Sequence, residues 1–283
     1  MFRDTAPTKE QLNNLLKFYQ SGNLLDAEKL AKSTIEEYPK HSFAYQILGA
    51  IFRKKGKNQE ALNANHNAVI LSPKDSRAHS NLGINLQELG RFNEAEKSFK
   101  KAISLQPDLA DVHYNLGITL QELGRLDDAI DSYKQAIAIK PSYAIAYINL
   151  GNIYQKSGKI EKAKESHKQA VSLQPDLAEA HYNYGNIQKE LGKLDEAKAS
   201  YKRAISLKPN LAEAHCNLGN TFQTLGEVNE AEISYNKAIS IKPDYAKAYS
   251  NLGNTLKDQG RLSEAKASYN KAIALQPNYA EAH

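Results

Sequence analysis

The histidines of this chain are the first residues whose type and spacing could support chemistry. Five of the eight recur at equivalent positions, separated by 34 residues or a multiple of 34: His79, His113, His181, His215 and His283. Zinc would need such ligands about 2.0–2.1 Å from one ion. Successive members fall in different repeats, which separates them by at least one helix-packing distance, roughly 8–10 Å. We therefore expect these histidines to be structural and predict no metal site.

The single cysteine offers no nucleophile. Cys216 directly follows His215, and adjacent helical residues point about 100° apart, so the two side chains cannot form a nucleophile–base pair. One cysteine also excludes a disulfide framework and fits a reducing compartment. The sequence contains no GK[ST] phosphate loop, no HExxH and no CxxC. We expect no catalytic residue and no cofactor within this chain.

Glycine and proline define the elements that position every side chain. Eight of the nine prolines are spaced 34 residues apart, from Pro39 to Pro277. All fifteen glycines fall into two columns with the same period, one from Gly49 to Gly253 and one from Gly22 to Gly260. A fixed period of this length indicates a repeat architecture.

Each 34-residue unit is predicted to form two helices. In the unit 76–109, Ala78, Leu82, Leu86 and Leu89 lie on one face of a first helix over about 77–89. Gly90 is expected to end that helix, because glycine readily adopts the left-handed backbone conformation that commonly follows a helix. A second helix over about 94–105 is expected to begin at a capping Asn93, and Pro107 ends it. Acceptors such as Asp176, three residues before Glu179, similarly predict capped first helices. The fold class is therefore all-α.

The repeated residues resemble the signature of the tetratricopeptide repeat. The columns that carry the resemblance include Leu82, Gly83, Leu86, Gly90, Ala95, Phe99, Ala102 and Pro107. The resemblance implies a right-handed superhelical solenoid of antiparallel helix pairs. In such a solenoid the first helices line a concave groove and the second helices form the convex side.

The repeats divide the chain into four segments. Residues 1–7 form an N-terminal extension, and residues 8–41 form a divergent capping repeat in which Leu15 replaces the early glycine and Ala31 replaces the aromatic residue. Seven consecutive repeats span 42–279. Residues 280–283 begin a further repeat that is truncated. An uncapped last repeat would expose apolar surface, so end-to-end self-association is expected there.

Asparagines recur on the predicted groove face. One column carries asparagine in six consecutive units, and a second column adds four more one turn later: Asn81, Asn115, Asn149, Asn183, Asn217 and Asn251, with Asn152, Asn186, Asn220 and Asn254. Two interpretations stay open. The amides could bond neighbouring helices and fix their packing, or they could offer donors and acceptors to an extended peptide.

The asparagine columns also resemble the repeats of O-GlcNAc-transferase-type proteins. Segments 146–152 and 248–254 (AYINLGN and AYSNLGN) carry this resemblance. It implies an asparagine-lined superhelix that recruits protein substrates to a C-terminal glycosyltransferase domain. This chain would then be the substrate-recruiting part of a larger enzyme.

Charge and composition limit the partners. The predicted groove columns hold five basic and seven acidic residues, although the chain has a net charge of +5. A groove that follows phosphates would be basic, so we expect no nucleic acid. No apolar stretch suggests a signal peptide or a membrane span. We predict a cytoplasmic, non-enzymatic scaffold that binds a protein or peptide in its concave groove.

Overall fold

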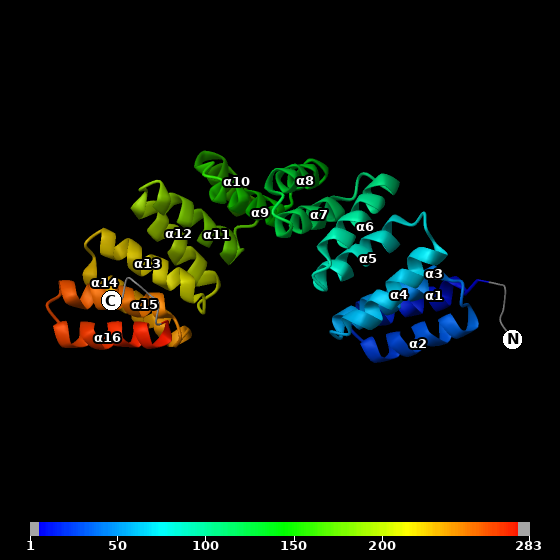
Figure 1. The fold of residues 1–283 in the computed structure, drawn as a ribbon, viewed down its shortest axis with the longest axis horizontal. Coiled ribbons are helices and arrows are strands. Elements are labelled where there is room, and N and C mark those ends of the chain that lie inside the picture. Colours follow the sequence, from blue (N-terminus) through cyan, green and yellow to red (C-terminus); the bar gives the residue numbers. More distant parts are fainter. Residues whose placement is uncertain (1–5, 277–283) are drawn as a thin grey trace. The chain divides into compact units, whose positions relative to one another are not determined.

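A computed structural model describes residues 6–276 and confirms the all-α fold. Those residues form sixteen helices and no strand. The helices follow one another in the order labelled in Figure 1, and the chain divides into two compact units, Met1–Pro141 and Ser142–His283. The expected truncated repeat at 280–283 lies outside the described residues, as do His283 and the first five residues.

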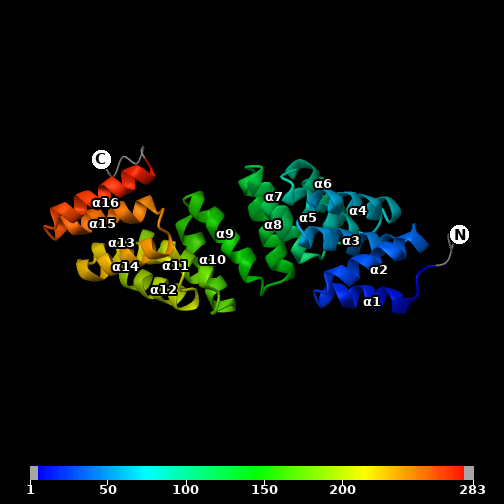
Figure 2. The same cartoon turned by 90° about the horizontal axis from the view of Figure 1, so that it is seen from below.

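Within residues 6–276, each unit contains eight helices, which pair into four successive hairpins. Figure 2 shows the same helices from a second side. The helices of the first unit are α1 (Lys9–Gln20), α2 (Leu24–Glu37), α3 (Ser42–Lys54), α4 (Asn58–Leu71), α5 (Ser76–Glu88), α6 (Phe92–Leu105), α7 (Ala110–Glu122) and α8 (Leu126–Ile139). Those of the second unit are α9 (Ala144–Lys156), α10 (Ile160–Leu173), α11 (Ala178–Glu190), α12 (Leu194–Leu207), α13 (Ala212–Thr224), α14 (Val228–Ile241), α15 (Ala246–Asp258) and α16 (Leu262–Leu275).

The glycines of the two columns have different roles in the hairpins. Glycines such as Gly90 lie in the three-residue turn between the two helices and have a φ of +71°, which a residue with a Cβ rarely adopts. Glycines such as Gly219 lie inside the first helix, where an added Cβ would stand 2.7 Å from Cε1 of Tyr235. The aromatic ring of the second helix therefore packs directly on the backbone of the first.

The first hairpin keeps this contact site but exchanges the sizes of its residues. Leu15 occupies the glycine position of α1, and Ala31 occupies the aromatic position of α2. Both side chains are fully buried in one apolar cluster that also contains Ile51 of α3. A large residue on the first helix thus compensates for a small one on the second, which explains how the divergent repeat still forms a hairpin.

The helix starts differ from the prediction. Asn93 was expected to cap α6, but α6 begins at Phe92, and Arg91 stands at the N-cap without a side-chain capping bond. Arg91 instead donates two hydrogen bonds of 2.7 Å to Glu94 in the first turn. The expected Asp176–Glu179 capping box is also wrong, because Leu177 is the N-cap of α11 and makes no side-chain capping bond.

We expect Gly219→Ala to change the stability in opposite directions depending on Tyr235. In the natural chain the new Cβ meets the ring, so the free energy of unfolding should fall by about 1–3 kcal/mol. With Tyr235→Ala already present, the same change should raise it by up to about 1 kcal/mol, because alanine is the better helix former. Chemical denaturation of the four proteins tests this. An equal loss in both backgrounds would contradict the packing account.

Candidate functional site: the inner face of each unit

The odd-numbered helices form the inner face of each unit. In the first unit α1, α3, α5 and α7 contact one another in sequence, and in the second unit α9, α11, α13 and α15 do so. Even-numbered helices of successive hairpins make no comparable contacts with each other within the described residues. Helices that approach on one side and separate on the other make a curved surface, so the odd-numbered helices lie on its concave side.

All ten predicted asparagines are half-buried on odd-numbered helices. Asn81 and Asn115 belong to the first unit, and the other eight belong to the second. In the first unit the second asparagine column is replaced by apolar residues: Leu16, Ala50, Ile84 and Ile118. The two units therefore present different inner faces, a polar one over 142–276 and a more apolar one over 6–141.

In the second unit, Asn186 of α11 joins three helices. Its Oδ1 accepts a hydrogen bond of 2.8 Å from the Tyr201 hydroxyl of α12. The same oxygen accepts a bond of 2.9 Å from Nδ2 of Asn217, which lies on α13 of the next hairpin. Asn217 Nδ2 also donates to the Tyr182 hydroxyl at 3.2 Å. One amide oxygen thus links both helices of its own hairpin to the next hairpin along the chain.

The next hairpin repeats this arrangement. Asn220 Oδ1 accepts from the Tyr235 hydroxyl at 2.7 Å and from Asn251 Nδ2 at 2.7 Å. The Tyr269 hydroxyl donates to Asn254 in the same way, at 2.7 Å. These are the bonds that the packing interpretation of the asparagines requires. They also fix the orientation of the bonded amides, those of Asn186, Asn217, Asn220, Asn251 and Asn254.

One hairpin of the second unit lacks the tyrosine. His167 of α10 occupies that position, is 0 % exposed, and has neither ring nitrogen bonded. Asn152, the matching asparagine of α9, makes no side-chain hydrogen bond within residues 6–276. Burial lowers the pKa of His167 to about 4, because the charged imidazolium would be removed from water.

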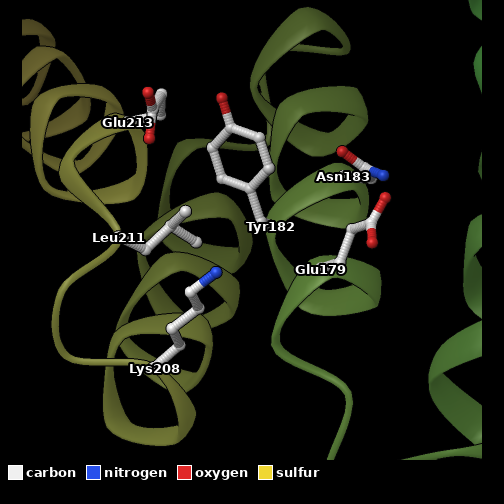
Figure 3. A pocket seen from close by; sticks show the side chains of 6 residues that line it. All are labelled: Glu179, Tyr182, Asn183, Lys208, Leu211 and Glu213. Atoms are coloured by element: carbon white, nitrogen blue, oxygen red, sulfur yellow. The ribbon is translucent and has the colours of Figure 1, made fainter. Parts of the chain in front are cut away.

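A pocket of about 310 Å³ opens on the inner face of the second unit (Figure 3). Its lining residues are Glu179, Tyr182, Asn183, Lys208, Leu211 and Glu213. The Tyr182 ring stands between α11 and α13, and the amide of Asn183 lies on the other side of α11. Asn183 makes no side-chain hydrogen bond within the described residues, so its donors and acceptor are available to a ligand.

Lysine charge also reaches this inner face. Lys189 of α11 is half-buried and has no ion-pair partner within the described part of the chain. Burial lowers the pKa of Lys189, and repulsion from Lys247 on α15 lowers it further. Within residues 142–276, the inner face therefore combines amide side chains with lysine charge that has no ion pair.

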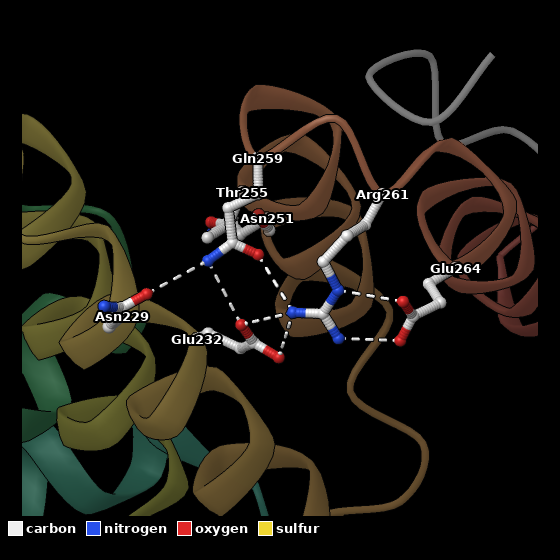
Figure 4. A network of polar contacts seen from close by, with 7 residues as sticks. All are labelled: Asn229, Glu232, Asn251, Thr255, Gln259, Arg261 and Glu264. Carbon is white, nitrogen blue, oxygen red and sulfur yellow. Dashed lines mark hydrogen bonds and ion pairs between the residues drawn. The ribbon is translucent and has the colours of Figure 1, made fainter.

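Many basic residues outside the inner face are already paired. Arg261 donates to both oxygens of Glu232 from the preceding hairpin, at 2.7 and 2.9 Å, and to Glu264 in its own helix (Figure 4). In the first unit, Lys32 and Lys55 contact Glu28, each at 2.6 Å, and lower its pKa to about 2. The Arg261–Glu232 and Lys55–Glu28 pairs connect neighbouring hairpins, whereas Arg261–Glu264 and Lys32–Glu28 lie within one hairpin.

The histidine column has a structural role. Nε2 of His79, His113, His181 and His215 lies 2.9–3.0 Å from the carbonyl oxygen of the proline six residues earlier. Each ring thereby ties the start of a first helix to the preceding turn. Among the described residues, no group of three or more His, Cys, Asp or Glu side chains could hold a metal ion. Within the same residues, no helix combines the length and apolar character needed to cross a bilayer.

The first unit contains a larger pocket, of about 530 Å³, that sequence reasoning missed. It is lined by side chains of α1, α3, α5 and the start of α7, among them Leu16, Tyr19, Phe43 and Ile47. Asn81 is the one predicted asparagine in its lining. The available signal was the replacement of asparagine by Leu16, Ala50, Ile84 and Ile118 in the second column.

Comparison with family sequence models identifies the repeats. A family described as TPR repeat matches residues 151–192, 185–226 and 223–260. Three families described as tetratricopeptide repeat match residues 74–142, 120–166 and 246–279. Residues before 74 lie outside these matches. A comparison with curated proteins finds no significant sequence match.

Solved structures of repeat proteins have similar folds. YrrB, described as a TPR protein with an unusual peptide-binding site, is 26% identical with a TM-score of 0.57, over 66% of this chain and 96% of that chain. MamA is 31% identical with a TM-score of 0.54, over 59% of this chain and 97% of that chain. PilF of Pseudomonas aeruginosa shares the fold at 20% identity and a TM-score of 0.65, over 73% of this chain and 94% of that chain.

Replacing His167 by tyrosine should stabilise the second unit. A tyrosine there can donate to Asn152 as Tyr201 does to Asn186, and the unpaired buried nitrogens are removed. We expect the free energy of unfolding at neutral pH to rise by about 1–3 kcal/mol. His167→Phe is the matched control, because it removes the nitrogens without offering a bond. A destabilised His167→Tyr protein would contradict the account.

The natural chain should also lose stability in mild acid because of His167. Between its ordinary pKa near 6.5 and its folded pKa of about 4, the unfolded chain binds a proton that the folded chain does not. Stability is therefore lost as the pH falls through this window, by about 3 kcal/mol in total. Unfolding free energies of the natural chain and His167→Phe, measured from pH 7 to pH 4, should diverge by this amount. Parallel curves would refute the assignment.

Proposed function

The chain belongs to the tetratricopeptide repeat family, and we propose that it is a protein–protein interaction scaffold whose concave, asparagine-lined face binds an extended peptide or flexible protein segment. The observation that carries this proposal is the fixed orientation of the amides on α11, α13 and α15. Groups held in place before a ligand arrives lose little conformational freedom when it binds.

The amide groups that the internal hydrogen bonds leave unused alternate along the face between N–H donors and oxygen acceptors. Asn186 and Asn220 use their oxygens within the network, so N–H groups remain. Asn217 and Asn251 use Nδ2, so within the described residues their oxygens remain. A peptide main chain carries one N–H and one C=O per residue and can match such a series of donors and acceptors.

Relatives support binding rather than catalysis. The peptide-binding site in the description of YrrB belongs to a protein that is 26% identical over two thirds of this chain. We infer a similar use of the repeats here. No peptide sequence is assigned by this likeness, which agrees with a face that contacts the backbone rather than particular side chains.

The second candidate is the substrate-recruiting part of a larger enzyme resembling O-GlcNAc transferase. The paired asparagine columns favour it as much as they favour a scaffold, since both would use the same face. The two candidates differ in the coding sequence expected downstream of residue 283. A glycosyltransferase domain in the same reading frame would favour the enzyme, and a short closing helix with a stop codon after it would favour the scaffold.

We expect Asn152→Ala combined with Asn183→Ala to weaken peptide binding without lowering the melting temperature. Neither amide has an internal hydrogen bond within residues 6–276, so their removal should reduce the affinity for the peptide and leave the stability of the fold unchanged. Two lost bonds at roughly 0.5–1.5 kcal/mol each correspond to about a 5- to 150-fold loss of affinity. The measurement uses peptides selected by the natural chain from a random-sequence library, with thermal unfolding of the same proteins.

Asn220→Ala is the matched control, because that amide is bonded within the protein. It should lower the melting temperature as well as the affinity. Unchanged affinity in the Asn152 and Asn183 double variant would contradict the ladder and leave the asparagines with a packing role. Failure of the natural chain to select any peptide would contradict the proposed function itself.

A further inference from the structure

The pocket of about 530 Å³ in the first unit differs in chemistry from the asparagine-lined face of the second. Its volume lies within the usual range of ligand sites. One side is apolar and comes from two helices, α1 and α3: Leu16, Tyr19, Phe43, Ile47 and Ala50. The other side carries charge from Arg53 of α3, Arg77 of α5, Asp108 in the turn before α7 and Asp111 of α7. A site divided in this way favours an amphipathic occupant.

The apolar side has room for a bulky side chain. Ala50 occupies the position at which later repeats of this unit carry Ile84 and Ile118, so the small residue leaves space beside Ile47. Phe43, Tyr19 and Leu16 are partly buried against the core of the first two hairpins. Their exposed portions therefore form a rigid apolar floor that a flexible ligand can cover.

The charged side holds one cation without a partner. Arg53 forms an ion pair with Glu88, in which Nε lies 3.8 Å from Oε1. The guanidinium of Arg77 makes no ion pair or side-chain hydrogen bond within residues 6–276. Asp108 and Asp111 also line the pocket, and they too lack ion pairs within those residues. Arg77 can therefore form an ion pair with one ligand carboxylate, whereas the two aspartates would repel a ligand with several acidic residues in succession.

We propose that this pocket recognises a partner segment in which a bulky apolar side chain is followed closely by a single acidic residue. The apolar side chain covers the α1–α3 floor beside Ala50, and the carboxylate pairs with Arg77. The inference rests on the proposed function, because it assumes that the chain binds flexible protein segments and assigns a sequence preference to the first unit alone.

The test uses fluorescein-labelled glycine–serine peptides measured by fluorescence anisotropy at low salt. The reference probe contains Phe-Gly-Glu. Its variants replace Phe by Ala, replace Glu by Gln, or extend Glu to a run of glutamates. The reference should bind best. Loss of the Phe ring should weaken binding by about tenfold or more, and loss of the charge by about two- to fivefold. The glutamate run should bind no more tightly than the single glutamate.

Two protein variants assign the effects to the pocket. Ala50→Ile fills the apolar side with a residue that the same helical position already tolerates, and it should abolish the preference for Phe over Ala. Arg77→Gln should abolish the preference for Glu over Gln and should reduce the salt dependence of binding. Ala138→Ile, at an exposed position of α8, is the matched control and should leave both preferences unchanged.

Three results would overturn the proposal. The first is a reference probe that binds no better than its Ala variant. The second is that Ala50→Ile keeps the preference for Phe and Arg77→Gln keeps the preference for Glu, while the Asn152→Ala and Asn183→Ala double variant still binds more weakly. That result would contradict the pocket proposal and leave the proposed function in place. The third is the absence of binding by every probe and by library-selected peptides, which would end both proposals together.

Discussion

The contact between a glycine of the first helix and a ring of the second is the constraint on which the rest of each hairpin from α5–α6 to α15–α16 depends. Where a Cβ at Gly185 or Gly219 would stand 2.7–2.8 Å from the tyrosine ring, the helices can approach only because no Cβ exists. That approach also carries the hydroxyls of Tyr201 and Tyr235 across to the asparagines of the inner face. Close packing and the polarity of the inner face therefore share one cause.

Much of the fold could be predicted from the sequence because the same structural residues recur from one 34-residue unit to the next. The glycine and proline columns predict the helices and the turn at Gly90, and both predictions are confirmed. Helix starts were predicted less well. Asn93 is a good capping residue by type, but the three-residue turn places Arg91 at the N-cap, and backbone geometry outweighs side-chain preference.

The inner face was predictable in part. The asparagine columns and their helix face could be identified from spacing alone, and the peptide ladder built on them stays a prediction. The shared hydrogen bonds could not be foreseen, because they require a hydroxyl from another helix to reach the same oxygen. Only a partial trace of them exists in the sequence: Tyr201 and Tyr235 accompany asparagine at 186 and 220 and Phe99 accompanies Ile84, but Tyr133 accompanies Ile118. The pocket of the first unit is lined by residues of four helices, and its only signal in the sequence was the apolar residue in place of asparagine in the second column.

The bonds between asparagines of successive hairpins also set a length scale. Asn217 bonds Asn186 at 2.9 Å and Asn251 bonds Asn220 at 2.7 Å, so α11, α13 and α15 cannot spread without breaking them. Helices in contact lie roughly 8–10 Å apart, and an extended chain advances about 3.3 Å per residue. A strand crossing these helices would therefore advance about three residues per hairpin. If the second unit binds an extended peptide as proposed, its asparagines would contact the peptide about every third residue.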